Sequence, residues 1–383
     1  MAIIPHRWRA QLDARRFARW LDEFAVADVV ARPLEFFDPF HTCFDDLEQA
    51  RYYQSKYVDE PKPVGDGLCV MTWNIKFAGG RIDFWFDGHG DRVIMSRDEV
   101  LQHLSGIAAK IDQVDPDVLL LQEVDVDSKR VAFIDQMQWL LDHTGLNYGA
   151  YASQWRADMV PAHGLGRVDM GIAVMSKYPV RDAVRIALPQ MTTQDGVTRY
   201  FYLKRALLTT RVDLPDAAPI DVVNVHTEAF STDGTKRRQL ELFRAELDRI
   251  DRAGGLFVAG GDLNALPPRS TRRHGFSDVA EGPDHFDASD YRHEKGWLAP
   301  LYEVYEPAVD LEDYDRDNGP HFTHSTSAEV FWSRKLDYLF TNGHFIDGST
   351  MTHQDASRGG METMLLSDHA PVSARLELSG KNR

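Results

Sequence analysis

The amino-acid sequence predicts an α/β protein made of layers of strands and helices. The prediction rests on short apolar runs, several of them apolar on both faces, and on amphipathic stretches that lie between them. The chain has 383 residues, of which 43% are hydrophobic and 27% are charged. A globular chain of this length and composition can bury a sizeable core.

The apolar runs have the length of β-strands and are bounded by polar or turn-forming residues. The predicted strands are Leu68–Trp73, Val118–Gln122, Gly171–Ser176, Phe201–Thr209, Ile220–Val225, Leu256–Ala259, Leu336–Thr341 and Val372–Leu378. Strands that are apolar on both faces lie inside a layered core rather than at a surface.

Two segments between these strands have the pattern of amphipathic helices. Ser96 precedes Glu99 at the spacing of a capping box, and apolar residues continue on one helix face as far as Ile111. Residues 236–252 repeat apolar side chains at helical spacing in the same way.

The first 65 residues differ from the rest, and we assign them to an N-terminal helical extension followed by the main domain at residues 66–383. Apolar residues between Trp8 and Phe24 recur at helical spacing among several arginines. Such a basic amphipathic helix can lie on an anionic membrane surface, or its apolar face can dock on the main domain. Prolines and glycines at residues 61–67 mark a linker.

The charge balance disfavours a general nucleic-acid binder. Lys and Arg number 43 and Asp and Glu number 59, which gives a formal net charge of −16. Nucleic-acid binders gain most of their non-specific affinity from basic residues that neutralise phosphates. The two cysteines, Cys43 and Cys69, form no disulfide framework. Since the sequence also shows no signal peptide and no spanning segment, we expect a cytoplasmic protein.

Polar residues interrupt or close several of the predicted strands. The segments are Trp73-Asn74, Gln122-Glu123-Val124, Asn224-Val225-His226, Gly261-Asp262-Leu263-Asn264, Lys335-Leu336-Asp337-Tyr338 and Ser367-Asp368-His369. A carboxylate or imidazole at the end of a buried strand is held rigidly at a sheet edge, where functional sites are built. Taken singly, each residue also has an ordinary explanation as a turn residue or a hydrogen-bonded histidine.

Together these residues form a set rich in hard oxygen ligands, with two histidines. The oxygen donors are Asn74, Glu123, Asp262, Asn264 and Asp368. Oxygen donors without cysteine suit Mg²⁺ or Mn²⁺ and fit a zinc site poorly. Such a set supports phosphoryl transfer to water, in which a metal stabilises charge and His or Asp moves protons.

In their order along the chain, these segments resemble the endonuclease/exonuclease/phosphatase superfamily. Its members include pancreatic-type deoxyribonucleases, apurinic endonucleases, inositol-polyphosphate phosphatases and neutral sphingomyelinases. The resemblance covers roughly residues 68–378. It implies a four-layer α/β sandwich in which two packed, mostly antiparallel sheets are flanked by helices, and it makes residues 66–383 the catalytic domain.

The resemblance also implies a role for each residue of the site. Glu123 would be the principal ligand of Mg²⁺ or Mn²⁺, with Asn74 beside it and Asp368 near the metal.

The resemblance divides the catalytic roles among five further residues. Asp262 would orient or deprotonate the attacking water, and Asn264 would hold a non-bridging phosphate oxygen. His369 would contact the scissile phosphate while Asp337 fixes its tautomer. His226 would act as general acid on the leaving-group side.

The chain departs from the family pattern in the first 65 residues and at two further places. Residues 79–90 form an aromatic, glycine-rich insertion that either grips substrate at the rim or covers apolar surface as a hairpin. Gly171-Ile172-Ala173 stands where many members read Gly-Asn-Ala.

Residues 277–317 carry 13 acidic and three basic side chains together with several aromatics. This segment would repel a long phosphate backbone, and it is either a solvated acidic loop or a cage for a cationic group. Basic candidates for phosphate contact are Lys204, Arg205, Arg269, Arg272, Arg273 and Lys335.

The sequence therefore predicts a Mg²⁺-dependent phosphodiesterase that uses metal-activated water on a small or lipid-linked phosphodiester. One alternative is a DNA or RNA endo- or exonuclease, although the net charge disfavours a nucleic-acid substrate. The other is a non-catalytic binding protein on the same fold. Peripheral membrane contact through the N-terminal helix and the oligomeric state stay open.

Overall fold

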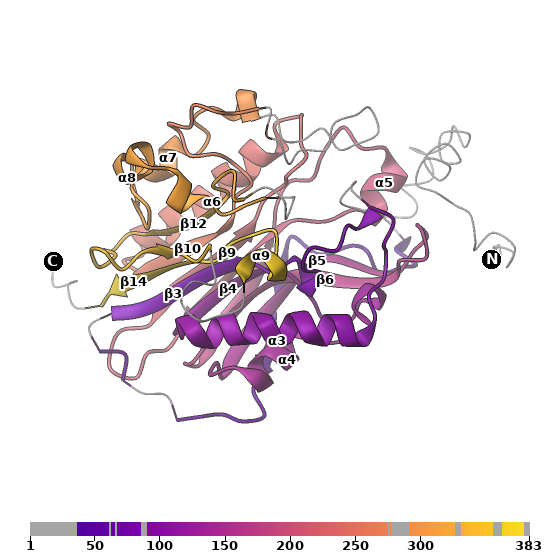
Figure 1. The fold of residues 1–383 in the computed structure, drawn as a ribbon, viewed down its shortest axis with the longest axis horizontal. Coiled ribbons are helices and arrows are strands. Elements are labelled where there is room, and N and C mark those ends of the chain that lie inside the picture. The colour runs from indigo at the N-terminus through magenta and orange to yellow at the C-terminus, as the bar shows by residue number, and fades with distance from the viewer. Residues whose placement is uncertain are drawn as a thin grey trace, which may run out of the picture.

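Two β-sheets packed face to face form the centre of the molecule (Figure 1). The structure is a computed structural model that describes residues 37–60, 63–65, 67–85, 90–274, 276, 291–325, 331–354 and 362–378. The helix expected between Trp8 and Phe24 lies outside these residues. In the described part of the chain, every helix is too short or too polar to span a bilayer.

Each sheet has seven strands. Sheet A has the order β1 (Leu47–Gln49), β7 (Val180–Ala187), β8 (Ala206–Val212), β9 (Ile220–His226), β10 (Phe257–Asp262), β12 (Asp337–Thr341) and β11 (Glu306–Pro307). Sheet B has the order β13 (Met351–Thr352), β14 (Val372–Glu377), β3 (Gly67–Asn74), β4 (Val118–Asp125), β6 (Gly166–Ser176), β5 (Tyr148–Val160) and β2 (Arg51–Gln54).

Both sheets are mixed but mostly antiparallel, as expected. β3 and β4 pair in parallel in sheet B, as do β9 and β10 in sheet A, whereas the other neighbouring strands pair antiparallel. A parallel pair needs a crossover connection, which α3 (Arg97–Val114) and α6 (Thr235–Arg252) provide. Each sheet thus contains one β-α-β unit, whose two strands end at the same edge.

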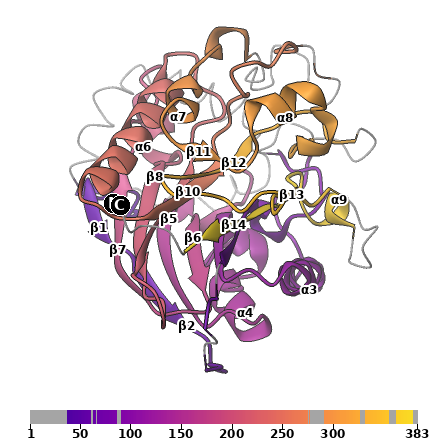
Figure 2. The ribbon, with the colours of Figure 1, turned by 90° about the vertical axis from the view of Figure 1, so that its left-hand side faces the viewer.

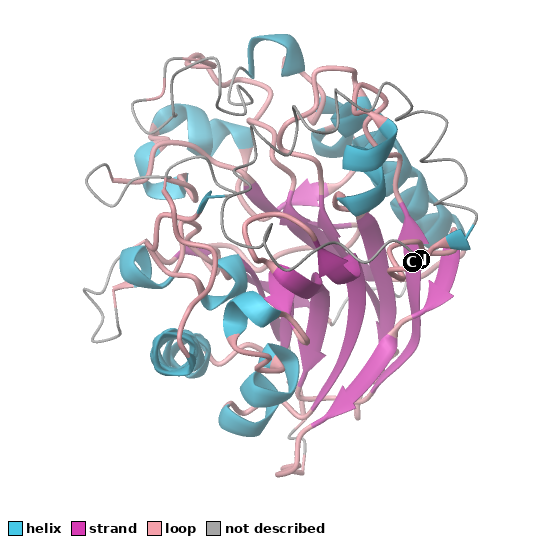
Figure 3. Cartoon of the chain, turned by 90° about the vertical axis from the view of Figure 1, so that its right-hand side faces the viewer, coloured by secondary structure: helices cyan, strands magenta, loops and turns pink. Residues whose placement is uncertain are grey.

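Helices cover the outer faces of both sheets and complete the four layers. α3 and α4 (Gln136–His143) pack against sheet B, and α6 and α7 (Ala299–Tyr302) pack against sheet A. Figure 2 shows the two groups of helices on opposite sides of the sheets, and Figure 3 shows the strands enclosed between helices. The shorter helices are α5 (Gly196–Phe201), α8 (Leu311–Arg316) and α9 (Thr363–Leu366).

The two predicted helices are confirmed. The Ser96 side chain accepts a hydrogen bond from the Glu99 amide, and the Glu99 carboxylate accepts one from the Ser96 amide, so the capping box at the start of α3 is complete. α6 covers the predicted range 236–252 and buries Phe243 and Leu247 against sheet A.

The prediction of a strand over Phe201–Thr209 is wrong in its first part. Residues Gly196–Phe201 form α5, and β8 begins only at Ala206. The side chain of Asp195 accepts hydrogen bonds from the amides of residues 197 and 198, which starts a helix in place of a strand.

The sequence analysis missed β5 because polar residues interrupt its apolar pattern. Ser153 on this strand donates a 2.6 Å hydrogen bond to Asp169 on β6, and Arg51 of β2 contacts both residues. These partners satisfy one another inside the sheet, so the strand tolerates a polarity that sequence periodicity does not reveal.

Two further strands lie on the N-terminal side of the predicted boundary at residue 65. β1 pairs with β7 at the edge of sheet A, and β2 pairs with β5 at the edge of sheet B. The described part of the predicted extension therefore contributes strands to both sheets.

The departure at Gly171-Ile172-Ala173 lies in the core. Ile172 is fully buried between the sheets, and Asn224 of sheet A donates a 2.8 Å hydrogen bond to the carbonyl of Ala173. A Cβ atom on Gly171 would lie 2.1 Å from the carbonyl oxygen of Ala152, so this position excludes any side chain.

The described parts of the two insertions pack on the core. Phe84 is buried and contacts Phe77 edge to face, while Trp85 stacks on His163. In the segment 291–317, the tyrosines are largely buried. Tyr305 packs in the core beside α6, and Tyr291 packs in a small apolar cluster with Leu336. These aromatics therefore support the fold instead of lining a cage.

Candidate active site

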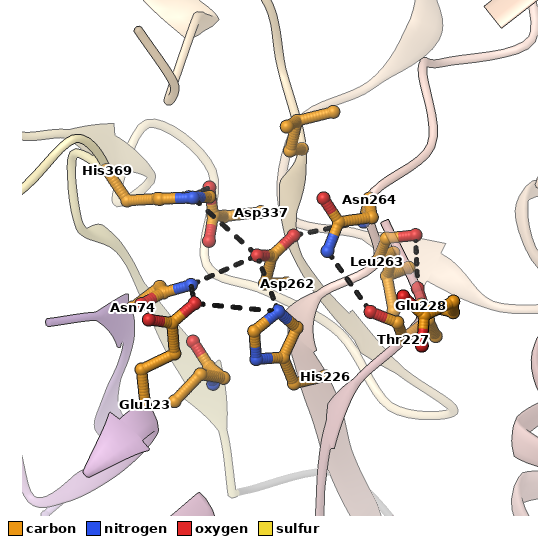
Figure 4. A network of polar contacts seen from close by, with 12 residues as sticks. Asn74, Glu123, His226, Thr227, Glu228, Asp262, Leu263, Asn264, Asp337 and His369 are labelled. Carbon is orange, nitrogen blue, oxygen red and sulfur yellow. Dashed lines mark hydrogen bonds and ion pairs between the residues drawn. The ribbon is translucent and has the colours of Figure 1, made fainter. Parts of the chain in front are cut away.

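The polar strand-end residues meet at the edge where both parallel pairs end. Asn74 is the last residue of β3 and Glu123 lies near the end of β4, while His226 and Asp262 end β9 and β10 and face each other in register. The carboxyl ends of parallel strands are the usual place for a site in α/β sheets. Figure 4 shows side chains from both sheets converging there.

Asn74 joins the two halves of this cluster. Its Nδ2 atom donates hydrogen bonds to Glu123 Oε1 at 3.2 Å, in its own sheet, and to Asp262 Oδ2 at 3.1 Å, in the opposite sheet (Figure 4). The side-chain oxygen of Asn74 accepts a hydrogen bond from the Lys76 amide, which fixes the amide orientation.

A β-bulge turns Glu123 toward the site. The pairing of β4 with β6 shifts between Leu121 and Val124, and Glu123 has a φ of 55°. A bulge redirects a side chain out of the alternating pattern. The preceding Gln122 stays between the sheets, where it donates a 2.8 Å hydrogen bond to Asn224. The Glu123 side chain is 24% exposed, compared with 1% for Asp262.

Asp262 lies at the centre of the cluster. Its Oδ2 atom is 3.2 Å from His226 Nε2 and 3.6 Å from His369 Nε2, and its Oδ1 atom accepts a hydrogen bond from the Asn264 amide. Burial alone would raise the pKa of Asp262. The His369 charge and the contacts with His226 and Asn264 outweigh burial and hold the pKa well below its usual range.

His369 is paired with Asp337 on its other side. His369 Nδ1 lies 2.8 Å from Asp337 Oδ2, and the Asp337 amide donates to the hydroxyl of Thr323. Burial would lower the pKa of His369, but Asp337 and Asp262 raise it to about 10. This imidazole is therefore a cation at neutral pH.

His226, in contrast, is neutral at pH 7. Burial and the nearby guanidinium of Arg205 lower the pKa of His226 to about 4, although Asp262 acts in the other direction. Arg205 directly precedes β8, the strand that pairs with β9. Its Nε atom lies 3.9 Å from the Glu228 carboxylate, and its Nη1 atom lies 3.5 Å from Gln154 Oε1.

A tight turn after β10 places Asn264 beside the Asp262 carboxylate. Asn264 has a φ of 45°, and its Nδ2 atom donates a 3.1 Å hydrogen bond to the carbonyl of Thr227. Gly261 has a φ of 131°, and a Cβ atom there would lie 2.0 Å from the carbonyl oxygen of Val225. The Gly-Asp-x-Asn segment therefore needs its glycine to bring β10 this close to β9.

Asp368 occupies a neighbouring ion pair. Its Oδ2 atom lies 3.5 Å from Lys76 Nζ, and its Oδ1 atom accepts from the Ser367 hydroxyl. Burial would raise the pKa of Asp368, but Lys76, His369 and further cations hold it well below its usual range. Asn74 and Glu123 thus contact each other directly, while Asp368 contacts Lys76.

Two neighbouring groups of ligand atoms could hold a metal ion. Asp262, Asp337 and His369 each offer one atom within 4.8 Å of the others. Glu123 and Asp262, joined through Asn74, form the second group, in which carboxylate oxygens supply the donor set that Mg²⁺ or Mn²⁺ prefers. The chemistry of these residues therefore fits a hard divalent cation.

Of the basic candidates for phosphate contact, the structure connects Arg205 to the site through its effect on His226, and Lys335 through a 2.9 Å hydrogen bond to the backbone carbonyl of Asp337. Lys204 donates to a backbone carbonyl, and Arg269 pairs with Asp315 at the surface. The sequence analysis did not single out His324. Its ring lies edge to face on the ring of His369, with 4.6 Å between the ring centres. Its position between two strand-end motifs gives no local sequence signal.

A family model and several solved structures match this chain. The model of the Endonuclease/Exonuclease/phosphatase family matches residues 71–369. An endonuclease/exonuclease/phosphatase from Beutenbergia cavernae DSM 12333 is similar in structure, with a TM-score of 0.55 and 22% identity over 82% of this chain and 72% of that chain. No curated protein matches the sequence.

Two further solved structures share the fold. The human Nocturnin catalytic domain with bound sulfate anion has a TM-score of 0.51 and 17% identity, and the match covers 86% of this chain and 97% of that chain. A functionally unknown conserved protein from Enterococcus faecalis V583 has a TM-score of 0.50 and 16% identity, with 81% and 100% covered. At these identities the likeness shows the fold.

Proposed function

The chain belongs to the endonuclease/exonuclease/phosphatase family, and on that premise we propose that it is a divalent-metal-dependent phosphodiesterase. The observation that carries the proposal is the position of Asp262, whose carboxylate lies between His226 and His369 and is joined through Asn74 to Glu123. This arrangement combines an oriented carboxylate, a neutral imidazole and a cationic imidazole at one sheet edge.

We place the metal ion on the Glu123 side of the cluster. Asp337 and His369 already neutralise each other through their 2.8 Å contact, whereas Glu123 is the most solvent-accessible carboxylate around Asp262. Glu123 and Asp262 would hold Mg²⁺ or Mn²⁺, and Asn74, whose Nδ2 atom donates to both carboxylates, would orient them. When bound, the ion supplies charge neutralisation for the phosphate oxygens.

Asp262 suits the task of orienting the attacking water. Its lowered pKa keeps the carboxylate ionised, so it can accept a hydrogen bond from the water and take up the proton that the water loses as the new P–O bond forms. From Asp262 this proton can pass to His226 Nε2, 3.2 Å away. His226 is neutral in the free protein. The negative charge of a bound phosphodiester would raise its pKa, so that His226 could then protonate the leaving oxygen.

His369 and Asn264 would hold the non-bridging oxygens of the phosphate. His369 is cationic because Asp337 and Asp262 flank it. The side-chain amide of Asn264 has two N–H donors, of which one serves the carbonyl of Thr227 and the other is available to the substrate. Donors fixed before the reaction stabilise the charge that develops in the transition state.

The substrate that we propose is a small or lipid-linked phosphodiester. The net charge of −16 and the acidic segment 277–317 both oppose the approach of a long phosphate backbone. A nuclease is the second candidate, because the family description includes endonucleases and exonucleases.

A substrate panel tests this proposal. The purified protein is incubated with bis-p-nitrophenyl phosphate, phosphomonoesters, phospholipids and single-stranded DNA, with Mg²⁺, with Mn²⁺ and with EDTA. We expect metal-dependent cleavage of phosphodiesters and indifference to DNA. DNA cleavage with a steep salt dependence would favour the nuclease. Failure to cleave any phosphoester would favour a binding protein on the same fold.

We also propose a cytoplasmic location, because the sequence has only two cysteines, which cannot form a disulfide framework. Fractionation of cells that produce the protein checks this proposal, and the soluble cytoplasmic fraction is the expected location.

A further inference from the structure

A fully buried lysine supports the turn that carries Asn264. Lys236 lies in the first turn of α6, and its side chain has no exposed surface. Its Nζ atom donates a 2.7 Å hydrogen bond to the carbonyl of Asn264 and a 2.6 Å hydrogen bond to Glu294 Oε1. The same ammonium group lies 5.4 Å from the centre of the Tyr291 ring.

We infer that Lys236 is a positioning residue for the hydrolytic reaction, held in place by Glu294, and this inference rests on the proposed function. Asn264 adopts a left-handed backbone conformation, which a non-glycine residue keeps only when its surroundings impose it. The Lys236 ammonium fixes the carbonyl of Asn264, and the Asp262 carboxylate fixes its amide. These hydrogen bonds to the carbonyl and the amide of Asn264 fix its backbone, and thereby the direction in which its side-chain N–H donor points.

Glu294 makes this arrangement possible in the buried interior. A buried ammonium without a counter-ion is costly, whereas an ion pair that is also hydrogen-bonded is tolerated. Glu294 ends the 3₁₀ helix Tyr291–Glu294, which belongs to the acidic segment 277–317. Through Lys236, the described part of that segment is therefore linked to the turn that carries Asn264.

The same 3₁₀ helix also supports the other side of the site. The guanidinium of Arg334 lies 5.9 Å from the centre of the Tyr291 ring, and the Arg334 carbonyl accepts hydrogen bonds from the amides of Thr323 and His324. Thr323 in turn accepts from the amide of Asp337, the partner of His369. The turn that carries Asn264 and the start of β12 are therefore both linked to the 3₁₀ helix Tyr291–Glu294.

The inference is tested by removing the charges as a pair. In the variant Lys236→Met/Glu294→Leu, two apolar side chains of similar volume replace the buried ion pair, a change that is often neutral for stability. We expect Tm near that of the wild type, kcat for bis-p-nitrophenyl phosphate at least about tenfold lower, and KM within about twofold. Lys236→Met alone should lower Tm, because it leaves the Glu294 charge buried and unpaired.

A matched control removes an ion pair from the exposed face of the same helix. Arg237 and Glu241 pair at 2.9 Å, and both side chains are largely exposed. The variant Arg237→Met/Glu241→Leu should keep both Tm and kcat. If Lys236→Met/Glu294→Leu has the kcat and the Tm of the wild type, the role of the ion pair is not that of positioning Asn264, and the inference is overturned.

Amide hydrogen exchange gives a readout that does not depend on activity. The amides of Leu263 and Asn264 are hydrogen-bonded in the wild type, and their protection should fall in the double variant while that of β9 and β10 stays unchanged. Unchanged protection over residues 262–266 would contradict the inference. Faster exchange there in a protein that cleaves no phosphoester would support the positioning and reject the proposed function. If the double variant unfolds at the assay temperature, Glu294→Gln takes its place with the same readouts.

Discussion

Asp337 and His369 form a buried pair that connects the two sheets. Asp337 begins β12 in sheet A, His369 lies just before β14 in sheet B, and the distance from Oδ2 to Nδ1 is 2.8 Å. The indole of Trp73 donates to the backbone carbonyl of His369, which fixes the residue from its other side. The orientation and the charge of His369 thus depend on a carboxylate from the opposite sheet.

The first prediction concerns the pH dependence that this pair creates. In the wild type, His369 keeps its proton until the pH rises through its pKa of about 10, so kcat/KM should fall only above that region. Asp337→Asn removes a charge that raises this pKa. The alkaline decline should therefore move to lower pH by about one unit or more. Steady-state rates between pH 6 and pH 11 check this, and an unmoved decline would contradict it.

Removal of the charge on the central carboxylate should lower activity strongly without unfolding the protein. Asp262→Asn keeps the size of the side chain but loses the charge that holds His369 and orients the water, so kcat should fall about 10²–10³-fold. Single-turnover rates and thermal unfolding measure the two effects. The matched control is Asp221→Asn, at the opposite end of β9 in register with Phe257. Substantial turnover in a folded Asp262→Asn protein would exclude the assigned role.

The third prediction distinguishes the two candidate groups of metal ligands. If the ion lies on the Glu123 side, Glu123→Gln should raise the Mg²⁺ concentration needed for half-maximal activity by about tenfold or more. Asp337→Asn should leave that concentration nearly unchanged, because Asp337 serves His369. Metal titrations of both variants decide the question, and the reverse pattern would place the ion in the Asp262–Asp337–His369 group.

A further prediction concerns the stability of α3. Ser96→Ala removes the N-cap and should lower the free energy of unfolding by about 1 kcal/mol, as measured by urea denaturation. The hydrogen bond from the Ser96 amide and the contact with Arg92 lower the pKa of Glu99 to about 2.

The lowered pKa of Glu99 sets the sign of its pH dependence. Because the pKa in the folded state lies below that of the unfolded chain, the contribution is complete above about pH 4.3 and is lost as the pH falls toward 2. Glu99→Gln should therefore differ from the wild type at pH 7 and converge with it in acid. A constant difference between the two proteins would show that the charge of Glu99 is not involved.

The sequence analysis predicted the residues whose signal is local. Asn74, His226 and Asp262 each end a long apolar run, and a short motif marks each of them. The bulge at Glu123 was not predictable, because it depends on how β4 pairs with β6.

Residues whose role arises from tertiary packing gave no such signal. Lys236 and Glu294 are 58 positions apart, one in an amphipathic helix and the other in an acidic segment. In both settings a charged side chain is normally exposed. Their burial follows from the packing of the 3₁₀ helix Tyr291–Glu294 on α6, which hydrophobic periodicity does not report.

The placement of one β-α-β unit in each sheet has a consequence for any attempt to dissect the molecule. A fragment with sheet B alone would carry Asn74 and Glu123, and a fragment with sheet A alone would carry His226 and Asp262. Neither fragment would contain a working set of groups. The proposed hydrolysis therefore requires both sheets, and it should be lost under any condition that separates sheet A from sheet B.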